Sequence, residues 1–355
     1  MAGARLDGGE PRTALNRRES WLSEQRKYRT FSLQQQPREG SGSAARAAAA
    51  PLPLEFGVVW LLFVVAAVEM FVTYSRLPAR ELYHVSGSGL AGGASRVLVF
   101  SNFSTALVAI AMLAVLAERM PGRLSAVAAV VGVVLCAAVF WPGVVEEANL
   151  DAKPVNAVAA VGVLVAAALS VFAVRMLGRP VWSGRQPGVR VRVLVAAAAL
   201  FAGLPWLAAE LGFFLNGVPL LGWLYQTGTY LPTVPGLPPF PPAVHHGHHH
   251  GMDGVLLLLT ALLLSRVVPS VRRRWLRVGV GAYLALMACY AVGNIANDFW
   301  LEQVWKRHWT HWQIPDVLRP KLTLAWGLIV LASVAIYAAS VWWTGRQSRA
   351  QLTTR

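Results

Sequence analysis

The chain has 355 residues, of which 55% are hydrophobic and only 14% are charged, and its formal net charge at pH 7 is +15. Soluble domains carry about 25% charged residues, so the composition excludes an ordinary water-soluble enzyme. The positive charge would suggest a nucleic-acid partner in a soluble protein, but here the basic residues lie between apolar runs, so we expect no nucleic acid and attribute the charge to orientation in a membrane.

Residues 1–54 form a polar segment that contains Gly, Ser, Gln and a run of Ala. No apolar core lies near the start of the segment, so it does not have the pattern of a cleaved signal peptide. We predict a disordered, basic, cytoplasmic tail whose Arg26, Lys27 and Arg29 can lie on anionic lipid.

Eight apolar runs follow, and each reaches or approaches the roughly 20 residues that cross a bilayer. We therefore predict an all-α, polytopic integral membrane bundle of about eight transmembrane helices over residues 55–345, with a second cytoplasmic tail at 346–355. The runs are 56–74, 97–117, 125–145, 155–174, 193–215, 252–271, 278–297 and 322–343.

The segments between these runs alternate in their content of basic residues. Positive residues are retained on the cytoplasmic side, so the richer set is predicted to be cytoplasmic, together with both termini. All eight histidines then lie on the outward side. The basic residues are almost all arginine, which is typical of GC-rich coding, and the predicted location is a bacterial plasma membrane. The richer set is Arg119, Arg123, Arg175, Arg179, Arg185, Arg190, Arg192, Arg266, Arg272, Arg273, Arg274, Arg277, Arg346, Arg349 and Arg355, and the poorer set is Arg76, Arg80, Arg96, Lys153, Lys306, Arg307, Arg319 and Lys321.

The sixth run is short, because only fourteen residues, Met252 to Ser265, precede Arg266. Two forms are open. Either Arg266 snorkels to the inner interface and the helix continues to Val271, or the helix begins nearer His246 and carries the histidines into the outer half of the bilayer.

Three acidic residues lie near the outer ends of predicted spans: Glu69, Glu210 and Asp298. Ionisable groups within a membrane are costly and usually face a bundle interior or a wet cavity. One interpretation is that the three converge on an outward-opening pocket, where Glu69 or Glu210 would serve as a catalytic general base. The alternative is solvation at the interface, since each lies within two turns of a helix end.

Five histidines occur in the outward loop 216–253. If the end of this loop is helical, His246, His249, His250 and Asp253 lie at i, i+3, i+4 and i+7 on one face. Three imidazoles and a carboxylate are ligands for a divalent transition metal, zinc or copper. The alternative is a solvated low-complexity loop, which the preceding prolines favour.

A second outward segment, 298–320, contains His308 and His311 among several tryptophans. On a helix Trp305, Trp309 and Trp312 would share a face and insert into the headgroup region. His308 and His311 would then lie on the flank of that helix, either as further metal ligands or as ordinary interfacial residues.

The function predicted from these patterns is an outward-facing His/carboxylate site that binds a divalent transition metal. The site would serve a metal-dependent enzyme acting on a lipid or lipid-linked substrate at the outer leaflet. Two alternatives stay open: a non-catalytic membrane subunit or assembly factor, and a metal or proton carrier. The inner halves of the spans contain no ionisable residue apart from Arg266, which weighs against a carrier. The sequence does not determine an oligomeric state.

Overall fold

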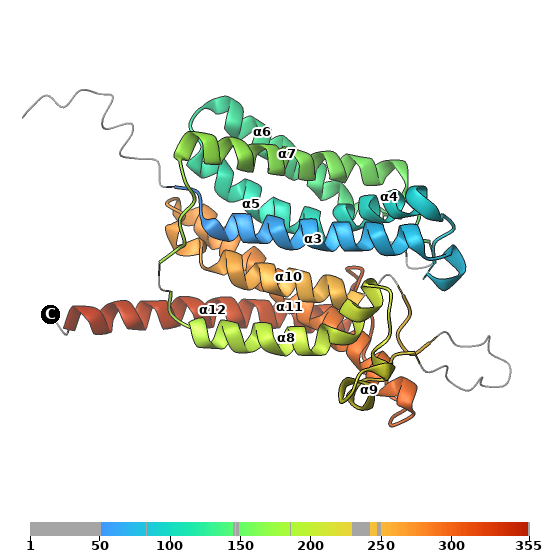
Figure 1. Ribbon diagram of the computed structural model, residues 1–355. Helices are drawn as coiled ribbons and strands as arrows, with labels where there is room; N and C mark the ends of the chain where they lie inside the picture. Colours follow the sequence, from blue (N-terminus) through green and yellow to red (C-terminus); the bar gives the residue numbers. More distant parts are fainter. Residues whose placement is uncertain are drawn as a thin grey trace, which may run out of the picture. The chain divides into compact units, whose positions relative to one another are not determined.

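The computed structural model describes residues 51–82, 84–144, 146, 149–184, 186–228, 242–246 and 250–353. These residues form helices joined by turns and loops (Figure 1). They contain no β-strand, only two isolated bridge pairs, Pro53 with Val181 and Leu82 with His246. The prediction of an all-α fold is confirmed.

Within the described ranges, seven helices are long and apolar enough to cross a bilayer. An eighth apolar helix, α10 (His250–Ser265), has only 16 residues, so the predicted number of eight spans stays a prediction. The seven are α3 (Leu54–Arg76), the continuous helix made of α4 (Gly89–Phe100), the π-helical turn η2 (Ser101–Thr105) and α5 (Ala106–Arg119), α6 (Arg123–Cys136) extended by the 3-10 turn η3 (Ala137–Phe140), α7 (Pro154–Leu177), α8 (Val189–Glu210), α11 (Arg274–Gln303) and α12 (Leu324–Thr353). Shorter turns are η1 (Ala79–Glu81), η4 (Leu215–Gly217), α9 (Leu221–Leu224), η5 (Val268–Ser270) and η6 (Trp305–Arg307).

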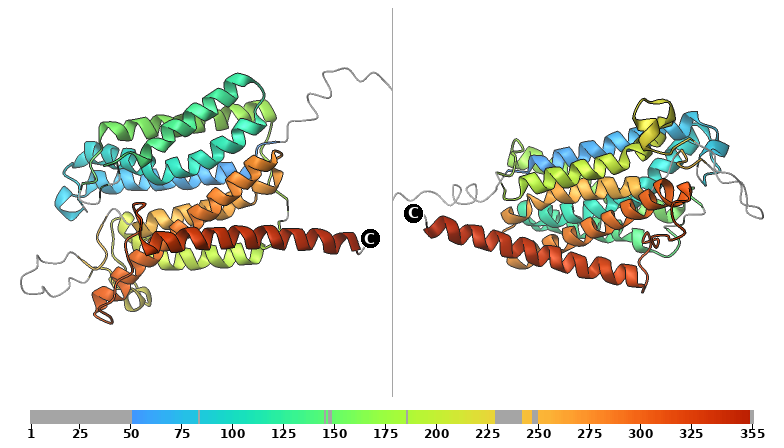
Figure 2. Two further views of the ribbon diagram at one scale, coloured as in Figure 1. Left: turned by 180° about the vertical axis from the view of Figure 1, so that it is seen from behind. Right: turned by 90° about the horizontal axis from the view of Figure 1, so that it is seen from below.

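The helices pack as two groups with α10 between them. The first group comprises α3 to α7; in the second, α8 and α10 pack on α11, and α12 covers another side of α11. Figure 2 shows α5, α6 and α7 on one side of this bundle and α12 on the other. Because α10 also contacts α3 and α5, most of its side chains are buried. The shortest apolar helix therefore joins the two groups, together with direct contacts of α11 with α5 and of α8 with α3.

The outer helices expose apolar side chains along their length. Leu61 of α3, Leu164 of α7, Leu194 of α8 and Leu331 of α12 are all exposed. Soluble monomers rarely expose contiguous apolar surface of this extent, whereas lipid tails solvate it without cost. The described helices are those of a multi-pass membrane protein.

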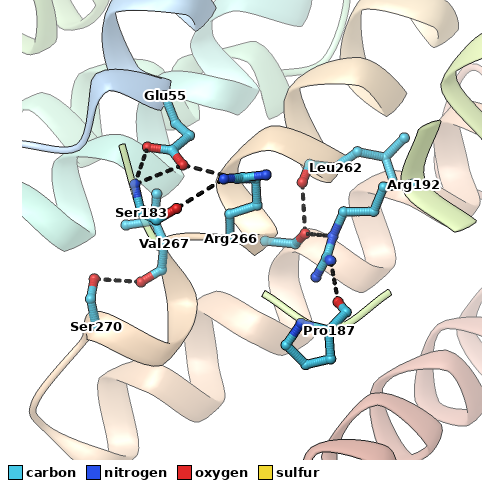
Figure 3. Close-up of polar contacts among 9 residues, drawn as sticks. Glu55, Ser183, Pro187, Arg192, Leu262, Arg266, Val267 and Ser270 are labelled. Carbon is cyan, nitrogen blue, oxygen red and sulfur yellow. Dashed lines mark hydrogen bonds and ion pairs between the residues drawn. The ribbon is translucent and has the colours of Figure 1, made fainter. Parts of the chain in front are cut away.

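At the end where α3 begins and α10 ends, which we call the inward end after the predicted orientation, a polar network joins the two groups (Figure 3). Glu55 is fully buried, and its Oε1 lies 3.0 Å from Nε of Arg266. The Ser183 backbone N–H donates to the same carboxylate at 3.1 Å, and Arg266 donates to the Ser183 carbonyl at 2.9 Å. Ser183 lies in the α7–α8 connection, so this ion pair fixes the connection between the two groups.

The sixth span matches neither of its predicted forms completely. α10 ends at Ser265 and is followed by the turn η5, so the helix does not continue to Val271. Arg266 pairs with the buried carboxylate of Glu55, and its snorkelling to the inner interface stays a prediction. As the second form predicts, the helix carries a histidine, His250, at its start.

The Trp/His segment is not one helix, so the prediction of a shared tryptophan face was wrong. α11 ends at Gln303, and after the single turn η6 the backbone of His308 is left-handed, with φ 58°. Trp312 instead packs edge-on against Trp300, whose indole N–H donates to the Trp312 carbonyl at 2.9 Å. Trp309 and Trp312 remain exposed, in a loop rather than on a helix.

Candidate functional site: a buried carboxylate cluster

Acidic side chains from four helices gather at the opposite end of the bundle, which we call the outward end. Glu210 is the last residue of α8 and is fully buried. It interacts electrostatically with Glu69 of α3 and with Asp253, which is buried in the first turn of α10. Asp253 interacts in turn with Asp298 of α11. The structure therefore brings Glu69 and Glu210 together, and links Asp298 to them through Asp253.

A buried arginine lies among these carboxylates. Arg96 of α4 is 1% exposed and interacts electrostatically with both Glu210 and Asp253. Its guanidinium carbon lies 5.7 Å from the centre of the Tyr74 ring, a cation–π contact. Arg96 therefore neutralises part of the negative charge of the cluster.

Among the described residues, none donates a hydrogen bond to the Glu210 carboxylate. Neither of its side-chain oxygens accepts a hydrogen bond from any described residue, and the same is true of Oε1 of Glu69. Thr73 donates to the backbone carbonyl of Glu210 instead. Burying a charged carboxylate without donors is so unfavourable that such a group usually becomes neutral or is paired with a cation. Glu210 is therefore a fully buried carboxyl group whose charge no described hydrogen-bond donor compensates.

The π-helical turn between α4 and α5 lies against Asp253. The hydroxyl of Ser104 donates to Asp253 Oδ1 at 3.1 Å, and both residues are buried. Asn102 of the same turn is 1% exposed, and its Oδ1 accepts no hydrogen bond within the described residues. π-helical turns frequently occur at functional sites because the extra residue widens the helix and re-aims its side chains. Here the widened turn directs polar side chains towards the start of α10.

The start of α10 is held by close packing around Gly251. Its backbone N–H donates to Asp298 Oδ2 at 2.5 Å, so a carboxylate occupies the positive end of the α10 dipole. A Cβ at residue 251 would overlap the ring of Trp206. Trp206 is itself fully buried and donates its indole N–H to Glu302. Only glycine fits between Trp206 and Asp298 without displacing one of them.

The predicted metal-binding face of four residues does not form on one helix. His250 is the first residue of α10 and interacts electrostatically with Asp253. His246 lies outside the helix, where its ring stacks on Phe214 at 4.2 Å and its Nδ1 lies 3.3 Å from the Ala209 carbonyl oxygen. The prediction that His246 shares a helical face with Asp253 was therefore wrong, and His249 lies outside the described residues.

His308 and His311 are exposed in the loop after η6. In the part of the chain that the structure describes, no three side chains of His, Cys, Asp or Glu are arranged to hold a metal ion. The second pair of histidines therefore does not extend the first set into a preformed metal centre. The metal-ligand roles of His246, His249, His250, Asp253, His308 and His311 stay predictions.

A pocket leads from the outward loops to the cluster. The α6–α7 connection lines its mouth, and Arg96, Asn102 and Asp253 line its base. At the mouth the Lys153 ammonium donates to the exposed Glu146 carboxylate and lowers its pKa below the ordinary value of 4.5. The remaining lining residues are Val99, Phe100, Phe103, Val144, Asn149, Leu150, Asp151 and Leu318.

The charge pattern of the sequence predicts that Arg96 lies in an outer connection. In the structure Arg96 is instead buried among the carboxylates of the site. The second apolar run predicted from hydropathy starts at residue 97, directly after this arginine, whereas α4 starts seven residues before it, at Gly89. An arginine preceded by a run of Gly and Ala and followed directly by Val97 is a signal that the helix continues through the charge. Glu302, the buried partner of Trp206, is likewise a charged residue inside a helix, since α11 continues past Asp298 to Gln303.

The chain matches no protein-family model, no curated protein and no solved structure.

Proposed function

We propose that this chain is a multi-pass membrane protein whose buried carboxylate cluster binds a cation at the outward end. The observation that carries the proposal is the fully buried Glu210, whose carboxylate has no hydrogen-bond donor among the described residues. Glu69 and Asp253 add negative charge beside it, and their repulsion with Glu210 is only partly offset by Arg96.

The charges of the cluster support this proposal. Four carboxyl groups, those of Glu69, Glu210, Asp253 and Asp298, interact in a chain, with Arg96 as a buried cation among them. Uncompensated charge is strongly disfavoured in a membrane interior. A proton on one carboxyl group or a metal ion shared between two would each reduce the imbalance.

The metal alternative is the one predicted from the sequence, with zinc or copper as the ion. It is supported by the electrostatic interactions of Asp253 with His250 and with Glu210, since imidazole and carboxylate are both zinc ligands. Because the described side chains form no complete ligand set, this alternative requires a ligand that moves, a bound water, or one of the neighbouring histidines.

Metal analysis of the purified protein tests the metal alternative. We expect about one transition-metal ion per chain in the wild type, and a loss of that ion in E210Q and in the triple variant H246A/H249A/H250A. E81Q, which removes an exposed carboxylate from η1, is the matched control and should keep the ion. Equal metal content in all four proteins excludes a metal at this site and leaves the proton as the cation.

A second candidate, catalysis on a lipid-linked substrate, is favoured by the position of Glu69. This residue is half-buried on α3, where its neighbours Val65, Val68 and Val72 are exposed to the surroundings of the bundle. A carboxylate at the border between the cluster and the lipid-facing surface can act as a general base on a substrate that arrives through the bilayer.

Incubation of the reconstituted protein with extracted membrane lipids, followed by mass spectrometry, tests this second candidate. We expect the wild type to convert one lipid species and E69Q to lose that conversion, while E81Q retains it. No converted species with the wild type would count against catalysis while leaving cation binding intact.

A further inference from the structure

The pocket at the outward end connects exposed loop residues with the buried carboxylate cluster. Its exposed lining residues Glu146 and Asn149 lie in the α6–α7 connection, whereas the buried Arg96, Asn102 and Asp253 lie on three helical elements. The exposed Asn149 and the buried Asp253 therefore line the same pocket.

The mouth is anchored by hydrogen bonds to the loop between α3 and α4. The Leu150 backbone N–H donates to the His84 carbonyl at 2.9 Å, and the Ser86 backbone N–H donates to Asp151 at 3.2 Å. The Ala152 backbone N–H donates to Ser95 of α4 at 2.8 Å. These contacts hold the acidic side chain of Asp151 at a fixed position beside the opening.

Apolar side chains also line the pocket. Phe100, Val144, Leu150 and Leu318 line it, and each is at least nine-tenths buried. An apolar lining of this kind limits the entry of bulk water.

The base of the pocket supplies oxygen atoms. Asn102 Oδ1 is buried and accepts no hydrogen bond from the described residues, and the Asp253 carboxylate accepts one from Ser104. Amide and carboxylate oxygens replace the water ligands of a small cation as it loses its hydration shell. Asp253 in turn interacts electrostatically with Glu210.

We propose that this pocket is the pathway by which a small cation reaches Glu210 from the outward side, with Asn102 and Asp253 as its oxygen ligands along the way. The inference rests on the proposed function, because a pathway requires a cation site at its end. In this pathway Asn102 positions and selects the cation, and the α6–α7 connection keeps the opening of the pocket in a fixed position.

Thiol labelling tests the pathway without requiring any bound cation. In a background in which the buried Cys136 and Cys289 are replaced by alanine, N102C is exposed in lipid nanodiscs to small methanethiosulfonate reagents, one neutral and one cationic. We expect both to modify N102C, as detected by intact-protein mass. Adding L150W, which enlarges a side chain of the pocket lining, should slow modification of N102C about tenfold. N149C at the mouth is the positive control, and M112C, which is buried in α5 and does not line the pocket, should remain unmodified.

The charge at the mouth gives an independent readout. D151N should slow the cationic reagent more than the neutral one, whereas K153Q, which removes the positive partner of Glu146, should accelerate the cationic reagent selectively. Labelling of N149C without labelling of N102C would overturn the proposed pathway. If N102C does not fold, F103C, which also lines the pocket, replaces it. Labelling of N102C in a protein that binds no cation would instead contradict the proposed function and leave the pocket open to another small ligand.

Discussion

Gly251 shows how a single residue shapes the candidate site. It has no side chain, and this allows the ring of Trp206 to lie against the start of α10 while the Gly251 N–H donates to Asp298. The same turn of helix contains His250 and Asp253, whose charges interact. The geometry of the carboxylates therefore depends on a close approach that only glycine permits.

We expect G251A to destabilise the protein, because the new methyl group would overlap the Trp206 ring. Overpacking of this kind costs about 1–3 kcal/mol, and thermal unfolding in detergent would measure the loss. G327A is the matched control, since a Cβ there meets nothing within 4 Å and the substitution favours a helix by about 0.5–1 kcal/mol. Equal unfolding temperatures for G251A and the wild type would show that Trp206 moves away at no cost.

The carboxylates themselves could be chosen from the sequence, but Arg96 could not be placed. Glu69, Glu210 and Asp298 were identified because acidic residues within apolar runs are expensive. Arg96 follows the same rule, yet it lies next to a Gly/Ser-rich segment and therefore resembled a loop residue. Which charges meet inside the bundle depends on helix packing, and single-sequence patterns do not contain that information.

Individual helices were predictable where polar residues closely follow the apolar run, and less so where the helix continues into polar sequence. The predicted run 56–74 became α3, Leu54–Arg76, and 155–174 became α7, Pro154–Leu177. α11 and α12 extend beyond their predicted ends to Gln303 and Thr353, because helices continue into polar sequence that hydropathy does not count. The segment after Gln303 differs for another reason: a left-handed residue at His308 ends the helical path.

The α6–α7 connection is the element whose stability should depend on pH. Lys153 donates to Glu146, and this hydrogen bond lowers the Glu146 pKa below 4.5. A lowered pKa in the folded state contributes stability that is present above the ordinary value and is lost as the pH falls through the folded value. We therefore expect hydrogen exchange in residues 141–153 to be unchanged from pH 7 down to about 4.5 and to increase below it, after correction for intrinsic exchange.

E146Q should remove this dependence, because the amide does not titrate in that range. D151N, in the same connection, is the comparison, since its hydrogen bonds come from Ser86 rather than from Lys153. If protection of the connection from hydrogen exchange falls equally with decreasing pH in the wild type and in E146Q, the Glu146–Lys153 pair does not stabilise it.

At the scale of the whole molecule, two helical groups meet on α10 and are fixed at both ends by polar contacts. At the inward end Glu55, Arg266 and Ser183 form the joint; at the outward end the carboxylate cluster brings together α3, α8, α10 and α11. The inward joint is satisfied by its own partners, whereas the outward cluster has, among the described residues, a carboxylate without a donor. Because of this contrast, we assign a structural role to the inward joint and propose a binding role for the outward cluster.

R266A should destabilise the protein strongly, because it leaves the fully buried Glu55 without its cationic partner. Breaking a buried ion pair from one side costs about 3–5 kcal/mol, which denaturant or thermal unfolding in detergent would detect. The double variant E55Q/R266A should recover part of the loss, since it removes the uncompensated charge. A loss in R266A no greater than that in the double variant would contradict the assigned role.

The orientation of the bundle is a prediction from the distribution of arginine, and reporter fusions test it. Fusions within 216–228 and 308–320 should give signals from the side opposite the cytoplasm, and a fusion after Arg355 should give a cytoplasmic one. A cytoplasmic signal from either of the first two would place the carboxylate cluster at the inner side of the membrane.

Infrared difference spectroscopy of the wild type against E210Q tests the central claim most directly, because it reports the chemical state of one carboxyl group. If a cation compensates Glu210, the difference spectrum contains either the carbonyl band of a protonated acid or a carboxylate band that shifts when a chelator removes the metal. The control difference, wild type against E81Q, contains only the band of an exposed, ionised carboxylate. A Glu210 band that is ionised and insensitive to the chelator would contradict cation binding at this cluster.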